Sequence, residues 1–480
     1  MSDPSADRVP AAATSKSVPT VANTGAIAAV GLELQEGKVI PRKQVISWAL
    51  WDWANQPFNT VILTFIFTAL YLTTEAFLPA DLASLPDGDP AKEAGLASLA
   101  SGFGLAGTIA GLVILLIAPV LGARSDASGN RKKQLAITSL LVVITMALLY
   151  FVEADPAFFV LGVTLVALGS VFSEIAAVNY NAMLLQVSTP KTVGKVSGLG
   201  WGLGYIGGII ALVLVIVAYV FDWFGLPEEE GLPFRLVALG CAIWMVVFMI
   251  PILRNVPEIE PTPGRPRVGF FRSYAVLAND VARIYREARP TFWFLLASAV
   301  YRDGLAGVFA FGAIIANLVF HFEFLEVVLF GIAANLVAGV STIIAGRFDD
   351  RFGPRAVILT ALIGLVIAGT VTFFLHDSGK TIFWIFGLAL CVFVGPAQSA
   401  SRSLLARLTP VGREGEIFGL YATTGRAASF MSQAAWTIFI VAFGATYWGI
   451  LGIVLIIAVG LALMFFVSAG KDGVGKPSSE

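Results

Sequence analysis

The sequence has few charged residues for its length. Asp, Glu, Lys and Arg make up 13% of its 480 residues, against about 25% in an average soluble protein. Hydrophobic residues make up 57%, and the mean hydropathy is +0.83. This composition excludes an ordinary soluble domain, a disordered chain and a collagen, and it favours a protein embedded in a lipid bilayer. A formal net charge of -1 provides no basic excess for nucleic acid, so we expect no nucleic-acid partner.

Cysteine and histidine are also scarce, with two residues of each type. Cys241 and Cys391 lie inside apolar runs without a neighbour at metal or redox spacing, so we interpret them as small core residues. His321 and His376 lie outside the apolar runs, no HExxH string occurs, and no apolar run contains a Lys. We therefore expect no metal site, no cofactor and no intramembrane enzyme.

Long hydrophobic runs, in contrast, are abundant, and about 20 apolar residues suffice for a helix to cross a bilayer. The runs are continuously apolar rather than alternating, which predicts an all-α bundle and excludes a barrel. Twelve such spans are predicted, six in each half of the chain: Ile46–Phe77, Leu96–Leu121, Gln134–Val152, Ala157–Val187, Val196–Phe221, Phe234–Leu253, Thr291–Phe320, Val327–Ala345, Ala356–Leu375, Thr381–Leu408, Glu416–Phe443 and Thr446–Ser468.

The segments outside the spans complete the predicted domain organisation. We expect a disordered tail over 1–45, six-helix bundles over 46–253 and 291–468, a linker over 254–290 and a second tail over 469–480. The linker has apolar residues at helical spacing, which predicts an amphipathic surface helix. These apolar residues are Phe270, Tyr274, Leu277, Val281 and Ile284.

The basic residues predict the orientation. If successive loops are assigned to alternate sides, 25 of the 31 Lys and Arg residues share the side of the N-terminal tail, and only Lys92, Arg235 and Lys380 lie opposite. Because basic loops stay in the cytoplasm, we expect both termini there. For a bacterial protein this predicts a multi-pass protein of the inner membrane, and we expect a monomer.

A ten-residue loop pattern occurs twice, after the second and the eighth predicted spans. A second pair, 184–190 and 404–410, repeats at a similar separation, so we infer two halves of one ancestral unit. Glycines permit a tight reversal between helices, and an Asp can cap a helix start or pair with the Arg. The residues shared by the two loops are Gly122, Asp126, Gly129 and Arg131 in the first copy and Gly346, Asp350, Gly353 and Arg355 in the second.

This loop pattern resembles the loop motif of the major facilitator superfamily, whose fold of two pseudo-symmetric six-helix halves is then expected here. A narrower resemblance is to the vacuole effluxer branch, the autophagy-related amino-acid effluxers and their bacterial relatives. It implies proton-linked transport of amino acids or similar solutes. Two departures are Met431–Gln433, where the family is expected to have a Gly-Pro pair, and Tyr205, which replaces the proline of an exchanger motif. The motifs are Trp48–Asn55, Tyr301–Gly304, Gln398–Ser403 and Phe418–Tyr421.

Charged residues inside the spans mark the candidate site. Their charges sum to zero, and unpaired they would cost on the order of 10 kcal/mol, so we expect them to face the interior and pair. In the superfamily the first, fourth, seventh and tenth helices line the central cavity, and all but Arg426 lie on these helices. A static structural ion pair remains an alternative for each. The residues are Asp52, Glu174, Arg302, Asp303, Arg402 and Arg426.

Their depths differ. At 1.5 Å per residue, Asp52 and Arg402 lie roughly 9 Å from the cytoplasmic ends of their spans, so they could pair when that side is closed. Glu174, Arg302 and Asp303 lie roughly 16 to 20 Å deep, the level of a binding site. Arg302 and Asp303 are about 100° apart on the helix, so they cannot both face one partner.

The expected function is secondary transport of a small polar solute, an amino acid or short peptide, by proton-coupled alternating access. An amino acid could place its carboxylate on Arg302 and its ammonium on Glu174, and Glu174 could carry the proton with Asp52 or Asp303 assisting. A channel, a transporter of another solute class, and a transporter-fold sensor or scaffold remain alternatives. Pro57 predicts a bend in the first helix. Additional candidate lining residues are Asn55, Gln56, Asn59, Asn179, Asn181, Tyr301 and Gln398.

Glycines four residues apart predict close helix packing. Gly200, Gly204 and Gly208 form one such row, and Gly107 and Gly111 form another. The string over 202–207 also matches a dinucleotide fingerprint, but no strand precedes it, so packing is the better interpretation.

Overall fold

A computed structural model describes residues 35–86, 89–227, 229–258, 282, 284–286, 288–322, 324–409, 413–443, 445 and 447–467. Within these ranges all regular structure is helical. Ten of the described helices are long and apolar enough to cross a membrane. Residues 1–34 of the tail predicted over 1–45, the whole tail predicted over 469–480 and most of the predicted linker helix lie outside the described residues. Residues 42–45 belong to α1 and not to a disordered tail.

The first half begins with a span that changes its helix type. Short 3-10 turns connect several of the helices. The elements are α1 (Arg42–Pro57), π-helices Phe58–Phe65 and Thr68–Leu72, α2 (Ala80–Ala83), α3 (Pro90–Ser128), α4 (Arg131–Leu148), α5 (Phe159–Ala182), α6 (Val193–Val220) and α7 (Leu232–Asn255).

The second half has the same number of spans, one of them broken. Its elements are α9 (Arg289–Leu318), α10 (Phe324–Phe352), α11 (Pro354–Phe374), α12 (Lys380–Leu408), α13 (Glu414–Ala428), α14 (Met431–Phe443) and α15 (Trp448–Phe465).

The first predicted span differs from the continuous α-helix expected there. The α-helix ends at Pro57, and the chain continues as two π-helices. Proline removes a backbone donor, and three threonines stabilise the wider turn beyond it. The hydroxyl oxygens of Thr64, Thr68 and Thr73 donate to the carbonyl oxygen five residues earlier, at 2.6, 2.8 and 2.9 Å. At Pro57, where a bend was predicted, the structure has a change in helix type.

The eleventh predicted span is also interrupted, because α13 ends at Ala428 and α14 starts at Met431. The Asp303 carboxylate of α9 accepts a hydrogen bond from the Ser432 backbone N–H, in the first turn of α14. This contact satisfies a donor that a helix start leaves unpaired, which is costly in a membrane interior. The sequence analysis predicted no break between these two pieces, although α14 is the more apolar of them.

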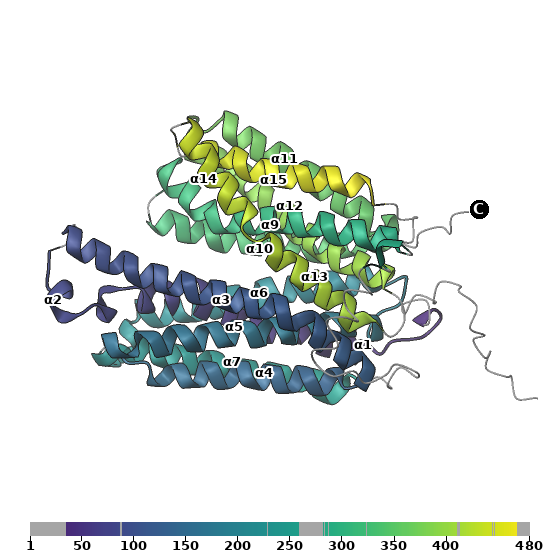
Figure 1. Ribbon diagram of the computed structural model, residues 1–480, viewed down its shortest axis with the longest axis horizontal. Helices are drawn as coiled ribbons and strands as arrows, with labels where there is room; N and C mark the ends of the chain where they lie inside the picture. The colour runs from purple at the N-terminus through teal and green to yellow at the C-terminus, as the bar shows by residue number, and fades with distance from the viewer. Residues whose placement is uncertain are drawn as a thin grey trace, which may run out of the picture.

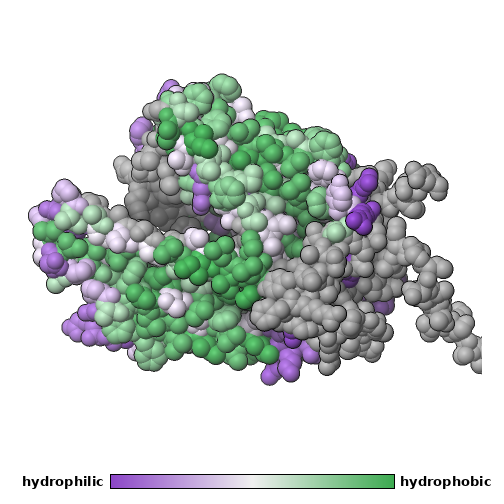
Figure 2. Space-filling model, in the orientation of Figure 1, coloured by the Kyte–Doolittle hydropathy of each residue, from purple (hydrophilic) through white to green (hydrophobic). Residues whose placement is uncertain are grey.

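The two halves meet at one end of the molecule and stand apart at the other. The start of α1 and the end of α15 lie together on the right of Figure 1, and we call this the termini end. At the opposite end α3 and α14 diverge, and the surface is hollowed between the halves (Figure 2). Hydrophobic side chains cover the flanks of both halves in Figure 2, as expected for a surface facing lipid.

Helix α6 contacts the other half through a row of glycines. Gly194, Gly198 and Gly202 face α10, where a Cβ on Gly198 would lie 2.7 Å from the Thr342 carbonyl oxygen and 3.1 Å from Gly346 Cα. No side chain fits at this distance, so glycine lets the two backbones touch. A second row on α6, formed by Gly200, Gly204 and Gly208, is predicted from its spacing to pack closely, and the structure shows this close packing.

That second row faces the first span. A Cβ on Gly208 would lie 2.7 Å from the Thr60 hydroxyl oxygen and 2.8 Å from Gln56 Cγ. The corresponding prediction for Gly107 and Gly111 is wrong, because nothing lies within 4 Å of a Cβ at either position. Gly107 is exposed and Gly111 is half-buried, so spacing alone does not separate a packed row from an exposed one.

Candidate functional site

A pocket lies between the halves, formed by α5, α6, α9, α12 and α13. It comprises about 400 Å³ of space, part of it continuous with solvent. Five of the charged and polar residues predicted for the site line it, namely Glu174, Asn181, Arg302, Gln398 and Arg402. The other lining residues are Val178, Trp201, Phe418, Tyr421 and Ala422.

Arg402 connects this pocket to the contact between the halves. Its Nη1 donates to the Asp52 carboxylate at 3.2 Å and to Asn181 Oδ1 at 3.0 Å. Its Nε and Nη2 donate to the Ser197 hydroxyl and carbonyl oxygens at 3.0 and 2.7 Å. Every one of these acceptors lies in the first half, whereas Arg402 lies on α12 in the second. The predicted pairing of Asp52 with Arg402 is present in this closed arrangement.

Aromatic rings fix the guanidinium of Arg402 in place. Its Cζ lies 5.0 Å from the Trp48 ring centroid, 5.5 Å from that of Tyr180 and 5.8 Å from that of Trp201. The Tyr180 hydroxyl donates to the Asp52 carboxylate at 2.8 Å. Because the rings hold the plane of the cation, its N–H groups can only point at their acceptors.

Gly200 of α6 makes this arrangement possible. A Cβ there would lie 2.8 Å from Arg402 Nη2, 2.8 Å from the Tyr180 hydroxyl and 3.0 Å from the Asp52 carboxylate. Any side chain would therefore displace the ion pair. The glycine row signalled close packing in the sequence, but only the fold shows that it packs against charges.

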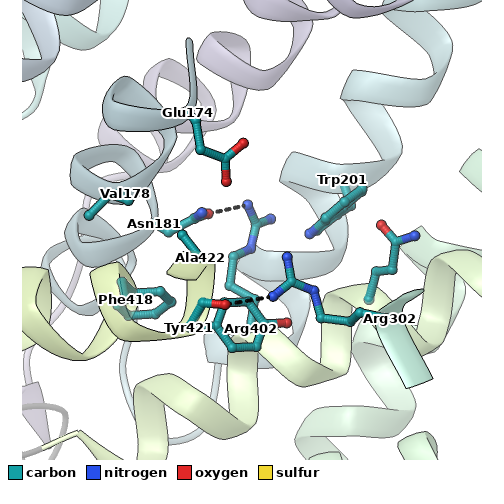
Figure 3. Close-up of a pocket in the computed structure, with 10 residues that line it drawn as sticks. Glu174, Val178, Asn181, Trp201, Arg302, Arg402, Phe418, Tyr421 and Ala422 are labelled. Atoms are coloured by element: carbon teal, nitrogen blue, oxygen red, sulfur yellow. Dashed lines mark hydrogen bonds between the residues drawn. The ribbon is translucent and has the colours of Figure 1, made fainter. Parts of the chain in front are cut away.

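The second guanidinium of the pocket, Arg302, is held by Tyr421. Its Nη1 donates to the Tyr421 carbonyl oxygen at 3.0 Å, and its Cζ lies 3.9 Å from the Tyr421 ring centroid. Figure 3 shows Glu174 extending into the pocket from α5, on the side of Arg402 remote from Arg302. Two cations and one carboxylate thus face the same space, backed by Asp52 behind Arg402.

Other predicted polar residues form contacts away from the pocket lining. Asn55 exchanges two hydrogen bonds with the Ser173 hydroxyl, at 3.0 and 3.1 Å. Asn179 accepts from Ser125 at 2.7 Å and is fully buried. Gln56 donates to Thr60 at 3.3 Å, and the Asn59 carbonyl oxygen accepts from Thr64.

Tyr301 and Asp303 flank Arg302 on α9 but face elsewhere. The Tyr301 hydroxyl contacts the Ser401 hydroxyl at 2.6 Å, and Tyr301 is fully buried. Asp303 caps α14, as described above. Arg302 and Asp303 therefore have different partners, as their separation around the helix predicts.

The first repeated loop joins the halves through an ion pair. Gly129 ends α3 with a left-handed φ of 67°, which glycine adopts without strain, and its N–H donates to Ser125 O. Arg131, at the start of α4, pairs with Glu414, at the start of α13, and both side chains are at least 92% buried. Gly122 precedes this turn inside α3. The side chains of Asp126 and Arg426 lie outside the described ones.

The second loop uses a different contact. The Asp350 carboxylate accepts from the backbone N–H groups of Gly194 and Lys195 at 2.7 and 2.9 Å, so it caps the start of α6 in the other half. Gly346 lies against the same turn. Gly353 has a φ of 88°, and Arg355 Nη2 donates to the Phe465 carbonyl oxygen at 3.4 Å.

Sequence reasoning missed several residues of this site, namely Trp48, Tyr180, Ser197, Trp201 and Glu414. Four of them are aromatic or small polar residues, which are common in spans and carry no distinctive spacing. Glu414 lies just before a predicted span, in a loop where an acidic residue has no distinctive signal. Among the described residues, no group of three or more His, Cys, Asp or Glu side chains could hold a metal ion.

Two six-span halves that enclose a polar pocket and close it at one end define a class of protein, the secondary transporters of the major facilitator superfamily. Solved structures confirm the fold. The E. coli fucose:proton symporter FucP superposes with a TM-score of 0.65 at 16% identity, over 89% of this chain and 98% of that one. The proton:xylose symporter XylE superposes with a TM-score of 0.67 at 12% identity, over 89% and 95%. The fold is therefore that of a multi-pass membrane protein.

Within that class, the chain belongs to the family described as vacuole effluxer Atg22 like, whose model matches residues 186–474. An uncharacterized MFS-type transporter, YxiO of Bacillus subtilis, is 27% identical over 88% of this chain and 95% of its own length. Autophagy-related protein 22 of Cryptococcus neoformans is 24% identical over 51% of this chain. The chain spans about half the length of that fungal relative, 47%.

Proposed function

We propose that the protein transports a small polar solute, an amino acid or short peptide, by proton-coupled alternating access. The observation that carries the proposal is the pocket between the halves, where Arg302, Arg402 and Glu174 face one space. A zwitterion needs one cationic and one anionic partner, and this space supplies both. The family description, vacuole effluxer Atg22 like, supports a transporter that exports its solute.

The contacts at the termini end support alternating access. Three independent polar contacts cross between the halves there: Arg402 with Asp52, Arg131 with Glu414, and Asp350 with the start of α6. Opening this end requires all three to break, while the opposite end already stands apart. The repeated loops act as gates in this proposal, and the glycines let the helices approach.

The orientation belongs to the same proposal. The termini end carries most of the Lys and Arg residues of the loops, so it lies in the cytoplasm, in the inner membrane of a bacterial cell. The conformation of the structure, closed at the termini end and open at the opposite end, is then outward-facing. A single chain contains both halves of the pocket, which supports a monomer as the working unit.

Proton coupling is assigned to Glu174, with Asp52 or Asp303 assisting. Glu174 is the carboxylate that lines the pocket together with Arg302 and Arg402. Purified protein in liposomes should accumulate labelled amino acids when a pH gradient is imposed. Glu174→Gln should abolish the dependence on the gradient while counterflow exchange survives.

The matched control is Glu229→Gln, which removes an exposed carboxylate outside the pocket and should leave the pH dependence at the wild-type level. If Glu174→Gln retained full dependence on the gradient, Glu174 would be removed from the mechanism. If no amino acid or peptide were transported with or without a gradient, the proposed solute class would be wrong.

A further inference from the structure

The pocket contains a hydrogen-bond donor that the sequence analysis did not assign. Trp201 Nε1 is buried and has no hydrogen-bond partner among the described residues. An indole N–H can only donate, and leaving a buried donor unpaired costs about 1–3 kcal/mol. Trp201 lines the same pocket as Arg302 and Arg402, and Figure 3 shows its nitrogen turned toward the two guanidinium groups.

A second unpaired indole shows why the position matters. Trp53 Nε1 is also buried without a partner, but Trp53 does not line the pocket and stacks on Trp244 at 5.5 Å between ring centroids. An unpaired indole is therefore no evidence of a site by itself. At Trp201 the same group points into a cavity beside two cations.

The cations cannot satisfy this donor, and their own faces are occupied. Arg302 stacks on Tyr421, and Arg402 lies among three aromatic rings, so an anion can meet only the edges of the two guanidinium groups. At Arg402 it must compete for N–H groups that already donate to Asp52, Asn181 and Ser197. The acceptor side of Asn181 is used by Arg402. Donors thus converge at this end of the pocket, which disfavours a cationic group and suits a planar anion.

We propose that Trp201, Arg302 and Arg402 form a subsite for the carboxylate of the transported solute. This inference rests on the proposed function, because it identifies which part of the pocket takes which part of the solute. Glu174 faces the pocket from α5 and supplies the negative charge that an ammonium group requires. Phe418 and Val178 offer apolar surface to the remaining carbon chain.

Carboxylate binding at this subsite also affects a contact that closes the termini end. Arg402 Nη1 is shared between Asp52 and Asn181, so a carboxylate that approaches Arg402 competes with Asp52 for the same guanidinium. Solute binding would in this way loosen one contact that closes the termini end. A solute without a carboxylate would leave that contact intact.

Binding is tested in detergent, without transport, by thermal unfolding of the full chain. The probes are L-leucine, 4-methylpentanoate and uncharged 4-methylpentanamide, which share one carbon skeleton, together with acetate and acetamide as a minimal pair at equal ionic strength. Bound ligand raises the apparent Tm. We expect the carboxylates to raise it and the amides to leave it unchanged.

Trp201→Phe keeps the ring and removes the donor, and it should weaken carboxylate binding about tenfold or more, since hydrogen bonds to charged groups are strong. Trp53→Phe is the matched control and should respond as the wild type does. The subsite is overturned if no carboxylate shifts the Tm, if the amides shift it equally, or if Trp201→Phe responds like Trp53→Phe. The last result would mean that Trp201 Nε1 meets only water.

This binding assay separates the two proposals. If carboxylates bind through Trp201 but liposomes show no transport of amino acids, the proposed function fails and the subsite stands. If transport is observed while Trp201→Phe binds carboxylates normally, the subsite fails and the function stands.

Discussion

Substituting Gly346 by Ala should open the termini end. A Cβ on Gly346 would lie 2.7 Å from the Gly194 carbonyl oxygen and 3.1 Å from Lys195 Cα, whereas ordinary contact starts at 3.4 Å. The shortfall to the nearest atom is therefore 0.7 Å, and the atoms it meets are backbone, which cannot rotate away. Helices α10 and α6 must separate, and this also stretches the 2.7 Å hydrogen bond from Gly194 N to Asp350.

Overpacking of this kind costs about 1–3 kcal/mol. The cost falls on the closed state alone, because the two helices part when the termini end opens. It corresponds to a shift of about 5- to 150-fold in the equilibrium between closed and open states.

The assay is the labelling rate of a cysteine placed at the interface. Ser399 is 2% exposed, and its carbonyl oxygen accepts from the Ser197 hydroxyl across the interface at 2.8 Å. Ser399→Cys is introduced after replacing the two buried native cysteines, Cys241 and Cys391. A maleimide reaches this position only in molecules whose termini end is open, so Gly346→Ala should raise the rate by the factor above.

Gly240→Ala is the matched control, because nothing lies within 4 Å of a Cβ at that position. It adds the same methyl group to a spanning helix at a position where the methyl group meets no neighbouring atom, so it should leave the labelling rate unchanged. A wild-type labelling rate in Gly346→Ala, with an unchanged Tm, would refute the claim that backbone contact between α6 and α10 closes this end.

Three more predictions concern the polar contacts of the same closure, measured by the same labelling assay unless stated. Asp52→Asn should raise the labelling rate about tenfold because it removes the 3.2 Å ion pair with Arg402. The fold is retained because Arg402 keeps its other acceptors. A wild-type labelling rate would mean that the ion pair does not hold the termini end closed. Arg131→Glu and Glu414→Arg should each raise the rate, and the double variant should return it toward the wild-type value; two additive increases would argue against a direct pair. Asp350→Ala removes a cap worth about 1 kcal/mol, so amide hydrogen exchange at the start of α6 should rise about fivefold, and unchanged protection there would contradict the assigned cap.

Much of the fold could be predicted from the sequence because each span must satisfy its own backbone in lipid. Continuous apolar runs therefore mark the helices, and ten of the described helices meet the requirement for crossing a membrane. The first and eleventh spans were predicted as continuous helices. The threonine hydrogen bonds after Pro57 and the Asp303 contact at α14 change them, and both depend on geometry that hydropathy does not encode.

The candidate site could be predicted only as a set of charges. A charge in a span is costly enough to stand out, so Asp52, Glu174, Arg302 and Arg402 were identified without a structure. Which partner each one has could not be predicted, because residues on different helices are brought together by packing. Gly200 illustrates this, since its spacing signalled a close contact but not that the contact is an ion pair.

The sequence by itself therefore determined that this protein lies in a bilayer, that it has two halves, and which charged residues lie inside its spans. The reason is that an unpaired polar atom in the bilayer interior is costly, so each exception stands out in the sequence. Tertiary structure alone decided the rest. It brought Arg402 against Asp52 across 350 positions of sequence, and it turned the unpaired nitrogen of Trp201 toward two guanidinium groups. An aromatic residue in an apolar span carries no free-energy cost in lipid. The local sequence therefore does not distinguish Trp201, as a hydrogen-bond donor in the pocket, from any other aromatic residue of a span.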